Sequence, residues 1–378
     1  MKGGRDPASG RQGPLRERGA RLSWPAGLPA ALPYLAPADT KPVMRIFKLL
    51  VLYPLILAVL AAAVGMWWLQ QPLRLPAGTS AERPLDVTIA SGASAQSIAQ
   101  TLADAGVGAP AELLYAWFRL SGESRDMKAG SYEFAPGTTP RTLLSKLVRG
   151  EQALRSIKLV EGWNVRQVLQ AVRSATDLRQ DIEGLSQADI MALIGYPGRH
   201  PEGRFFPDTY RVLKHAPASS VLRQAAKAME ERMAQAWAQR DPASPLRTPD
   251  EALILASIIE KETGLESDRR RIGGVFNNRL RIGMRLQTDP AVIYGLGEGF
   301  DGNLRRNDLT EDTPYNTYTR PGLPPTPIAM PGMSSIMAAV QPLSTNSMYF
   351  VARGDGSSQF SATLEEHNAA VRRYILRR

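Results

Sequence analysis

Apolar residues are spread very unevenly along this chain of 378 residues. The segment 49–69 holds 21 consecutive residues without a charge, enough for a helix to cross a hydrocarbon layer of about 30 Å. Trp67 and Trp68 lie at its far end, where aromatic side chains favour the membrane interface. The pattern predicts a transmembrane helix over 46–69, followed by a Pro-rich linker over 70–85. A buried core helix or a cleaved signal peptide is the alternative to a transmembrane helix.

Short alternating strands and amphipathic helices follow this linker. A period of two after Asp86 predicts a strand, and apolar residues at helical spacing predict helices over 95–105 and 111–120. A second strand is expected over 128–134 and a short helix over 140–148, which ends at a glycine. These elements predict a small α+β module over 86–152.

The remainder of the chain continues the mixture of strands and helices. A strand is expected from Ile157 with a helix directly after it, and residues 175–200 are predicted to be helical with loops. Residues 201–212 are predicted to form an aromatic loop. Further helices are expected over about 220–240, 250–263 and 361–374, with a linker over 242–249. We therefore predict an α+β fold class with a larger mixed α+β domain over 153–378.

Positive charge is concentrated ahead of the apolar segment. Residues 1–48 carry +6 of the net charge of +10, so the charge indicates membrane topology rather than nucleic-acid binding. The rule that positive flanks stay inside predicts a cytoplasmic N-terminus and an exported remainder. Residues 1–43 contain seven Pro and six Gly, which predicts a disordered cytoplasmic tail. We also hypothesise that the true start is Met44 rather than Met1.

The inventory of reactive side chains excludes several mechanisms. The chain has no cysteine, and its three histidines, His200, His215 and His367, are not arranged in a metal-binding motif. It contains no GxSxG nucleophile elbow and no glycine-rich nucleotide loop. We therefore expect no metal and no cofactor, and carboxylate chemistry is the default.

Two glutamates near the end of one apolar helix are candidates for that chemistry. Glu262 continues the apolar face that contains Leu255 and Ile258, while Glu260 lies about 200° around the helix. An apolar environment and the negative end of a helix dipole both raise the pKa of Glu262, as a general acid requires. The alternative is an ion pair with Arg269 or Arg270, and these residue patterns alone do not decide between the two.

Polar and aromatic side chains alternate downstream of a segment, 279–285, that we expect to be a basic loop. Amides, hydroxyls and rings at this density suit a sugar, whose hydroxyls need hydrogen bonds and whose C–H faces pack on rings. A turn-rich surface loop with buried tyrosines is the alternative. The candidate substrate-binding residues are Gln287, Thr288, Asp289, Tyr294, Asn316 and Tyr318.

Four long blocks of sequence resemble one known family. LASIIEKETG, VFNNRLRIGMRLQTDPAVIYGLG, TPYNTYTRPGLPPTPIAMPG and YFVARGDGSSQFSATLEEHN are similar, in order and spacing, to the YceG-like endolytic murein transglycosylases. Weaker similarity lies in MKAGSYEF, VEGWNVRQVL and EGRFFPDTYRV, so that the resemblance covers roughly Asp86 to Tyr374.

This resemblance implies a LysM-like module at 86–152, a catalytic domain at 153–378 with a lysozyme-like helix-end glutamate, and Glu262 as that catalytic residue. It implies cleavage of the MurNAc–GlcNAc β-1,4 bond in nascent peptidoglycan strands, with 1,6-anhydro-MurNAc ends and termination of strand elongation. The apolar segment and the charge ahead of it predict a single-pass protein of the bacterial inner membrane with a periplasmic catalytic domain. The resemblance implies association with peptidoglycan synthases. The alternatives are a membrane-tethered, glycan-binding scaffold without activity and a simple hydrolase. Oligomeric state and the length of the released strand stay open.

Overall fold

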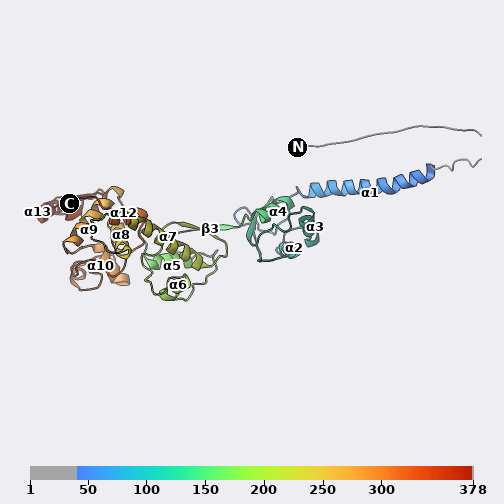
Figure 1. Ribbon diagram of the computed structural model, residues 1–378. Helices are drawn as coiled ribbons and strands as arrows, with labels where there is room; N and C mark the ends of the chain where they lie inside the picture. The colour runs from blue at the N-terminus through green and yellow to red at the C-terminus, as the bar shows by residue number, and fades with distance from the viewer. Residues whose placement is uncertain (1–40, 377–378) are drawn as a thin grey trace, which may run out of the picture. The chain divides into compact units, whose positions relative to one another are not determined.

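The computed structural model describes residues 41–376 (Figure 1). Helix α1 (Lys41–Trp68) contains one segment, Phe47–Trp68, that is long and apolar enough to cross a membrane, with a mean hydropathy of 2.5. A helix was predicted over 46–69, and the structure has one. The predicted tail 1–43 lies outside the described residues except for its last three, which begin α1. A second compact unit starts at Trp67 and contains all the remaining elements.

The first part of this unit has the predicted strand and helix order. Strand β1 (Leu85–Ile89) pairs antiparallel with β2 (Gly130–Phe134), and Val87 lies opposite Tyr132. Helices α2 (Ala95–Asp104), α3 (Ala111–Leu120) and α4 (Pro140–Arg149) complete it. Apolar side chains of all five elements form one core. The local sequence explains the helix ends, because Ser94 caps α2 and the left-handed Gly150 ends α4.

A second core lies around a two-stranded ribbon. Strand β3 (Leu154–Lys158) pairs antiparallel with β4 (Thr209–Leu213), and α5 (Val165–Arg173), α6 (Gln187–Leu193) and part of α7 (Ala218–Ala238) pack nearby. The prediction that 201–212 is entirely a loop was wrong, since β4 begins at Thr209. Alternate side chains of β4 are buried, a period-two pattern too short to stand out beside the aromatic loop.

The third core surrounds helix α8 (Pro249–Glu262). Helices α9 (Glu266–Arg281) and α12 (Met333–Val340) pack against it, and all three lie together at the C-terminal end of the unit (Figure 1). A Cβ on Gly273 of α9 would lie 2.2 Å from the Ala338 carbonyl oxygen, so the two helices approach closely because Gly273 has no side chain.

Shorter elements complete the C-terminal part. They are α10 (Asp289–Leu296), a 3₁₀ turn (Gly297–Gly299), α11 (Arg306–Thr310), the antiparallel hairpin of β5 (Tyr349–Ala352) with β6 (Ser358–Ser361), and α13 (Leu364–Tyr374). The expected basic loop at 279–285 was partly wrong, because Arg279 and Arg281 belong to the last turn of α9. The described residues therefore form a mixed α+β protein with three small antiparallel sheets.

Candidate active site

Helix α8 places Glu262 at its last position. Thr248 caps the helix by accepting the amide of Glu251, and Pro249 occupies the first turn, where a missing N–H is tolerated. The middle of the helix, from Ala252 to Ile259, is almost entirely buried. The helix ends when Thr263 adopts an extended conformation. A buried, rigid helix therefore presents the Glu262 carboxylate at a fixed point.

The Glu262 carboxylate has one hydrogen-bond partner among the described residues. The Thr288 hydroxyl donates to Oε1, and Oε2 is left without a protein partner. Burial raises the pKa of Glu262 to about 7, and the neighbouring charge of Asp289 acts in the same direction. The Thr288 bond and the more distant charge of Arg279 oppose this shift. The predicted raised pKa is confirmed, and a carboxyl group with this pKa is protonated in a large fraction of molecules near neutral pH.

Glu262 lines a cleft of about 500 Å³. Its lining residues come from the ends of α8 and α9, the segment that leads into α10, the loop that contains Tyr318, and β5, β6 and α13. The lining residues are Glu262, Arg279, Leu286, Gln287, Asp289, Tyr318, Tyr349, Phe350, Val351, Ala352, Ser358, Leu364, His367 and Asn368.

Three of the predicted substrate-binding residues lie in this cleft. Gln287 is exposed and has a φ of 50°, a left-handed conformation that is rare for a residue with a side chain. The Tyr318 hydroxyl donates to Asp289 Oδ1 at 2.5 Å, which fixes the carboxylate of Asp289 near Glu262. The cleft therefore contains an acid, a second carboxylate, an amide and a phenol.

The other three predicted residues do not line the cleft. Thr288 is only 2% exposed, and its hydroxyl donates to Glu262 Oε1 without lining the cleft. Asn316 is 1% exposed, and its amide donates to two backbone carbonyl groups, those of Asp308 and Glu311. The Tyr294 hydroxyl donates to Glu202. These three side chains hold the loops and helix around the cleft.

Glu260 occupies a different environment, as its position on the helix indicated. Its Oε2 accepts the amide of Gly332 at 2.9 Å, and its Oε1 lies 3.5 Å from the Arg269 guanidinium. Arg269 also pairs with Glu266, while Arg270 donates to the Gln341 carbonyl group. The alternative in which Glu262 pairs with Arg269 or Arg270 is thereby excluded, because both arginines have other partners.

Arg279 is a residue of the cleft that we did not single out from the sequence. Its guanidinium donates to the carbonyl groups of Arg285, Leu286 and Met348 and lies 5.2 Å from the centre of the Tyr349 ring. Burial lowers the pKa of Arg279, yet a guanidinium stays charged at any pH in question. It supplies the only positive charge among the lining residues of the cleft as the structure describes it.

The lining residues from β5 and α13 were also missed. The His367 ring stacks on Tyr349 with centroids 5.1 Å apart, and Asn368 follows it on α13. Burial and the charge of Arg279 lower the pKa of His367, so the imidazole is neutral in the cleft at neutral pH. These residues fall in the last block of the family resemblance, and that block was the available signal.

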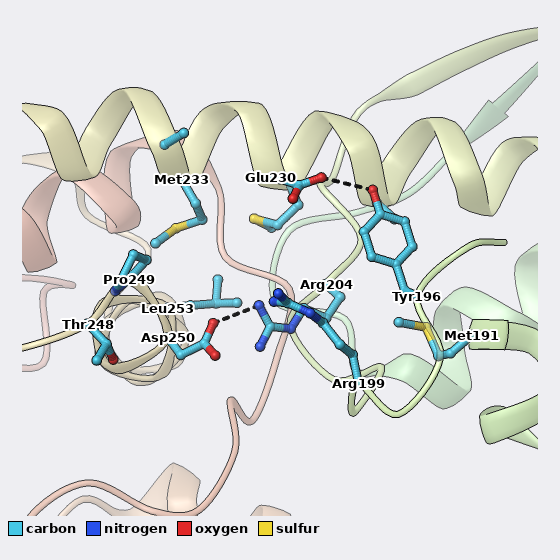
Figure 2. Close-up of a pocket in the computed structure, with 13 residues that line it drawn as sticks. Met191, Tyr196, Arg199, Arg204, Glu230, Met233, Thr248, Pro249, Asp250 and Leu253 are labelled. Atoms are coloured by element: carbon cyan, nitrogen blue, oxygen red, sulfur yellow. Dashed lines mark hydrogen bonds and ion pairs between the residues drawn. The ribbon is translucent and has the colours of Figure 1, made fainter.

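A second cavity, of about 330 Å³, lies elsewhere on α8 and shares no lining residue with the cleft (Figure 2). Met191, Met229 and Met233 supply apolar walls, and an ion pair of Arg204 with Asp250 crosses it. Asp250 and Glu262 are separated by about 18 Å along the helix axis, at 1.5 Å per residue. This cavity is therefore not part of the Glu262 cleft. Within residues 41–376 no cluster of three or more metal-ligating side chains occurs.

The described residues combine an apolar helix long enough to cross a membrane, a mixed α+β unit after it, and a cleft beside a helix-end glutamate with a raised pKa. The chain belongs to the YceG-like family, whose sequence model matches residues 87–373.

The chain is similar to several named proteins. A Bacillus subtilis (strain 168) protein called endolytic murein transglycosylase is 32% identical over 320 residues, which cover 79% of this chain and 87% of that protein. A protein of the same name from Streptococcus pneumoniae serotype 2 (strain D39) is 27% identical over 363 residues, covering 87% of this chain and 65% of that protein. A crystal structure of a yceG-like protein from Listeria monocytogenes aligns with a TM-score of 0.48 at 30% identity, over 75% of this chain and 98% of that one.

Proposed function

We propose that this protein is an endolytic lytic transglycosylase that cleaves the MurNAc–GlcNAc β-1,4 bond of nascent peptidoglycan strands and leaves 1,6-anhydro-MurNAc ends. The observation that carries the proposal is the position and pKa of Glu262, a helix-end carboxyl group with a pKa of about 7 on an open cleft. The Bacillus subtilis and Streptococcus pneumoniae relatives, both named endolytic murein transglycosylase, agree with it.

The first step is protonation of the leaving group. Because Thr288 occupies Oε1 of Glu262, the proton resides on Oε2, which has no protein partner in the described part of the chain. Glu262 donates this proton to the glycosidic oxygen as the bond between that oxygen and C1 of MurNAc breaks. The positive charge that develops at C1 is stabilised by participation of the sugar's own N-acetyl group or by early attack of its C6 hydroxyl.

The second step closes the anhydro ring. The C6 hydroxyl oxygen forms a bond to C1, and Glu262, now ionised, takes the proton of that hydroxyl group and returns to its starting state. No water is consumed, so this route needs one carboxylate rather than the pair that ordinary glycoside hydrolysis uses. Gln287, Asp289 and Tyr318 line the cleft and would orient the sugar, with Thr288 orienting the acid.

Asp289 favours one competing function, which is hydrolysis. Its carboxylate lies on the same cleft as Glu262 and is close enough to affect the pKa of Glu262. A carboxylate there could activate water, and the product would then carry a reducing end instead of an anhydro end. Mass spectrometry of the released glycans separates the two reactions, since they differ by the mass of one water molecule.

The site of action follows from α1. We propose that α1 is a single membrane anchor in the bacterial inner membrane, with the N-terminus in the cytoplasm and the cleft in the periplasm. Support comes from the apolar segment Phe47–Trp68 and from the positive charge that precedes it. The part at 86–152 is proposed to be a LysM-like module, and 153–378 the catalytic domain.

The test uses the full chain in detergent with isolated glycan strands. Glu262→Gln is expected to abolish anhydro-muropeptide formation while its circular dichroism and melting temperature stay near those of the unmodified chain. Glu260→Gln is the control in the same helix, and it should retain activity under conditions where it is folded. The assignment of Glu262 as the acid would be refuted if Glu262→Gln kept full activity while a folded Glu260→Gln protein lost it. Absence of any cleavage by the unmodified protein would favour a glycan-binding scaffold.

A further inference from the structure

A second buried glutamate lies outside the cleft and has no part in the mechanism above. Glu202 is 1% exposed and belongs to the loop between α6 and β4. Its two carboxylate oxygens accept the Val165 amide at 3.1 and 3.2 Å, and Oε2 also accepts the Tyr294 hydroxyl at 3.0 Å. A carboxylate is rarely buried without a role, because desolvation penalises its charged form.

Hydrogen bonding and close packing fix the conformation of the loop around Glu202. The Glu202 amide donates to His200 Nδ1 at 3.2 Å, and Gly203 has a φ of +77°. A Cβ at Gly203 would lie 2.5 Å from Pro327, so the loop is pressed against the segment 321–331. That segment is in turn held to the start of α5, because the Met330 amide donates to the Trp163 carbonyl at 2.7 Å.

Glu202 connects two helices that belong to different cores. Val165 is the first residue of α5, where the backbone N–H groups have no partner within the helix and attract an anion. Tyr294 is in α10, whose first residue is Asp289 and whose N-cap is Thr288. One carboxylate thus ties the start of α5 to the helix that carries two neighbours of Glu262.

Other contacts make α10 a rigid connection. The Tyr294 ring packs edge-on against Tyr315 with centroids 5.0 Å apart, and the Tyr315 hydroxyl is 2.8 Å from the Thr326 hydroxyl. At the other end, Thr288 exchanges hydrogen bonds with Thr317. Tyr294 follows Asp289 by about 7.5 Å along the helix axis, so a change at Tyr294 is transmitted over little more than one turn.

We propose that Glu202 is a positioning residue for the Glu262 site: by binding α5 and Tyr294 together, it holds α10 where Thr288 and Asp289 meet Glu262. This inference rests on the proposed function. It also makes the site respond to pH, since a protonated Glu202 has one acceptor position fewer for the Val165 amide and the Tyr294 hydroxyl.

The direction of this pH response follows from the surroundings of Glu202. Burial raises the pKa of Glu202 to about 7, while the Val165 amide, the Tyr294 hydroxyl and the Gly203 amide act against it. The charged and titratable groups that face it are Tyr294 from α10, Arg166 from α5 and His200 from its own loop, and the segment 321–331 has none. As the pH falls through about 7, Glu202 binds a proton and its hold on α10 weakens. Catalysis therefore requires ionised Glu202 and protonated Glu262, which predicts a bell-shaped pH profile.

The test compares Glu202→Gln and Tyr294→Phe with Asp181→Asn in the full chain. Asp181 is the matched control, because its carboxylate also accepts a helix-start amide, that of Ser219, but contacts nothing on α10. We expect Glu202→Gln to reduce kcat by about tenfold with little change in KM, and to remove only the acid limb of the pH profile. Tyr294→Phe should reduce kcat in the same way, and the double variant should be no worse than the more affected single one. Asp181→Asn should lower the melting temperature and leave kcat and both limbs unchanged.

Hydrogen–deuterium exchange of peptides from 289–296 provides a readout that needs no activity. Faster exchange there in Glu202→Gln, with normal exchange in Asp181→Asn, is expected. Unchanged exchange in α10, or an acid limb that persists in Glu202→Gln, would overturn the inference. If the unmodified protein forms no anhydro product, the proposed function fails, and the exchange result then still decides whether Glu202 holds α10.

Discussion

Replacing Thr288 by valine tests the electrostatic account of Glu262 directly. The Thr288 hydroxyl donates to Glu262 Oε1, and this bond lowers the pKa of Glu262 against the effect of burial. Valine has nearly the same shape, and Thr288 is only 2% exposed, so the change removes the hydroxyl without opening a cavity. The backbone bonds between Thr288 and Thr317 do not depend on the side chain of Thr288.

The magnitude follows from the strength of one hydrogen bond to a charged group. Such a bond contributes about 1.5–3 kcal/mol, and about 1.4 kcal/mol corresponds to one pKa unit, so the pKa of Glu262 should rise by about 1–2 units. The acid must be protonated to donate, hence the alkaline limb of activity moves to higher pH. For a rise of one unit from about 7, the protonated fraction at pH 8 increases about fivefold.

The assay is the pH dependence of kcat/KM for anhydro-product formation, supported by a ¹³C NMR titration of the glutamate carboxyl groups. Thr101→Val is the matched control, because within residues 41–376 the Thr101 hydroxyl donates only to the Ser97 carbonyl group in α2. An alkaline limb that stays in place, or one that moves to lower pH, would show that Thr288 does not stabilise the ionised form of Glu262.

Two further predictions concern the fold and the anchor. In a urea titration, Gly203→Ala should lower the free energy of unfolding by more than Gly184→Ala. Both glycines have a positive φ, but only at Gly203 would the added Cβ lie 2.5 Å from Pro327. Equal losses of unfolding free energy in the two variants would contradict the close packing at Gly203. Deleting the segment Phe47–Trp68 should move the protein from the carbonate-washed membrane fraction to the soluble fraction, and retention in the membrane would argue against a single anchor.

Local sequence signals predicted much of the secondary structure. Ser94 and Thr248 cap the helices expected to follow them, and Gly150 ends α4 in the left-handed conformation. These elements were predictable because caps and stops act over three or four residues. Strand β4 was not, because its alternating pattern covers only five residues and directly follows an aromatic segment that resembles a loop.

The candidate site was predictable only in part. Helical spacing separated Glu260 from Glu262, but the absence of an ion pair at Glu262 depends on where Arg269 and Arg270 find their partners. Arg279 was assigned to a loop because nothing in its own segment shows that three carbonyl groups would bury it.

By itself, the sequence determined the apolar segment, the positive charge that precedes it, most helix ends and the helix face on which Glu262 lies. Each of these features depends on neighbouring residues. The tertiary structure decided the pKa of Glu262, the partner of its carboxylate and the connection from Glu202 to α10. Burial and hydrogen bonding at these points involve residues 26 to 92 positions apart in the chain, and only folding brings them together.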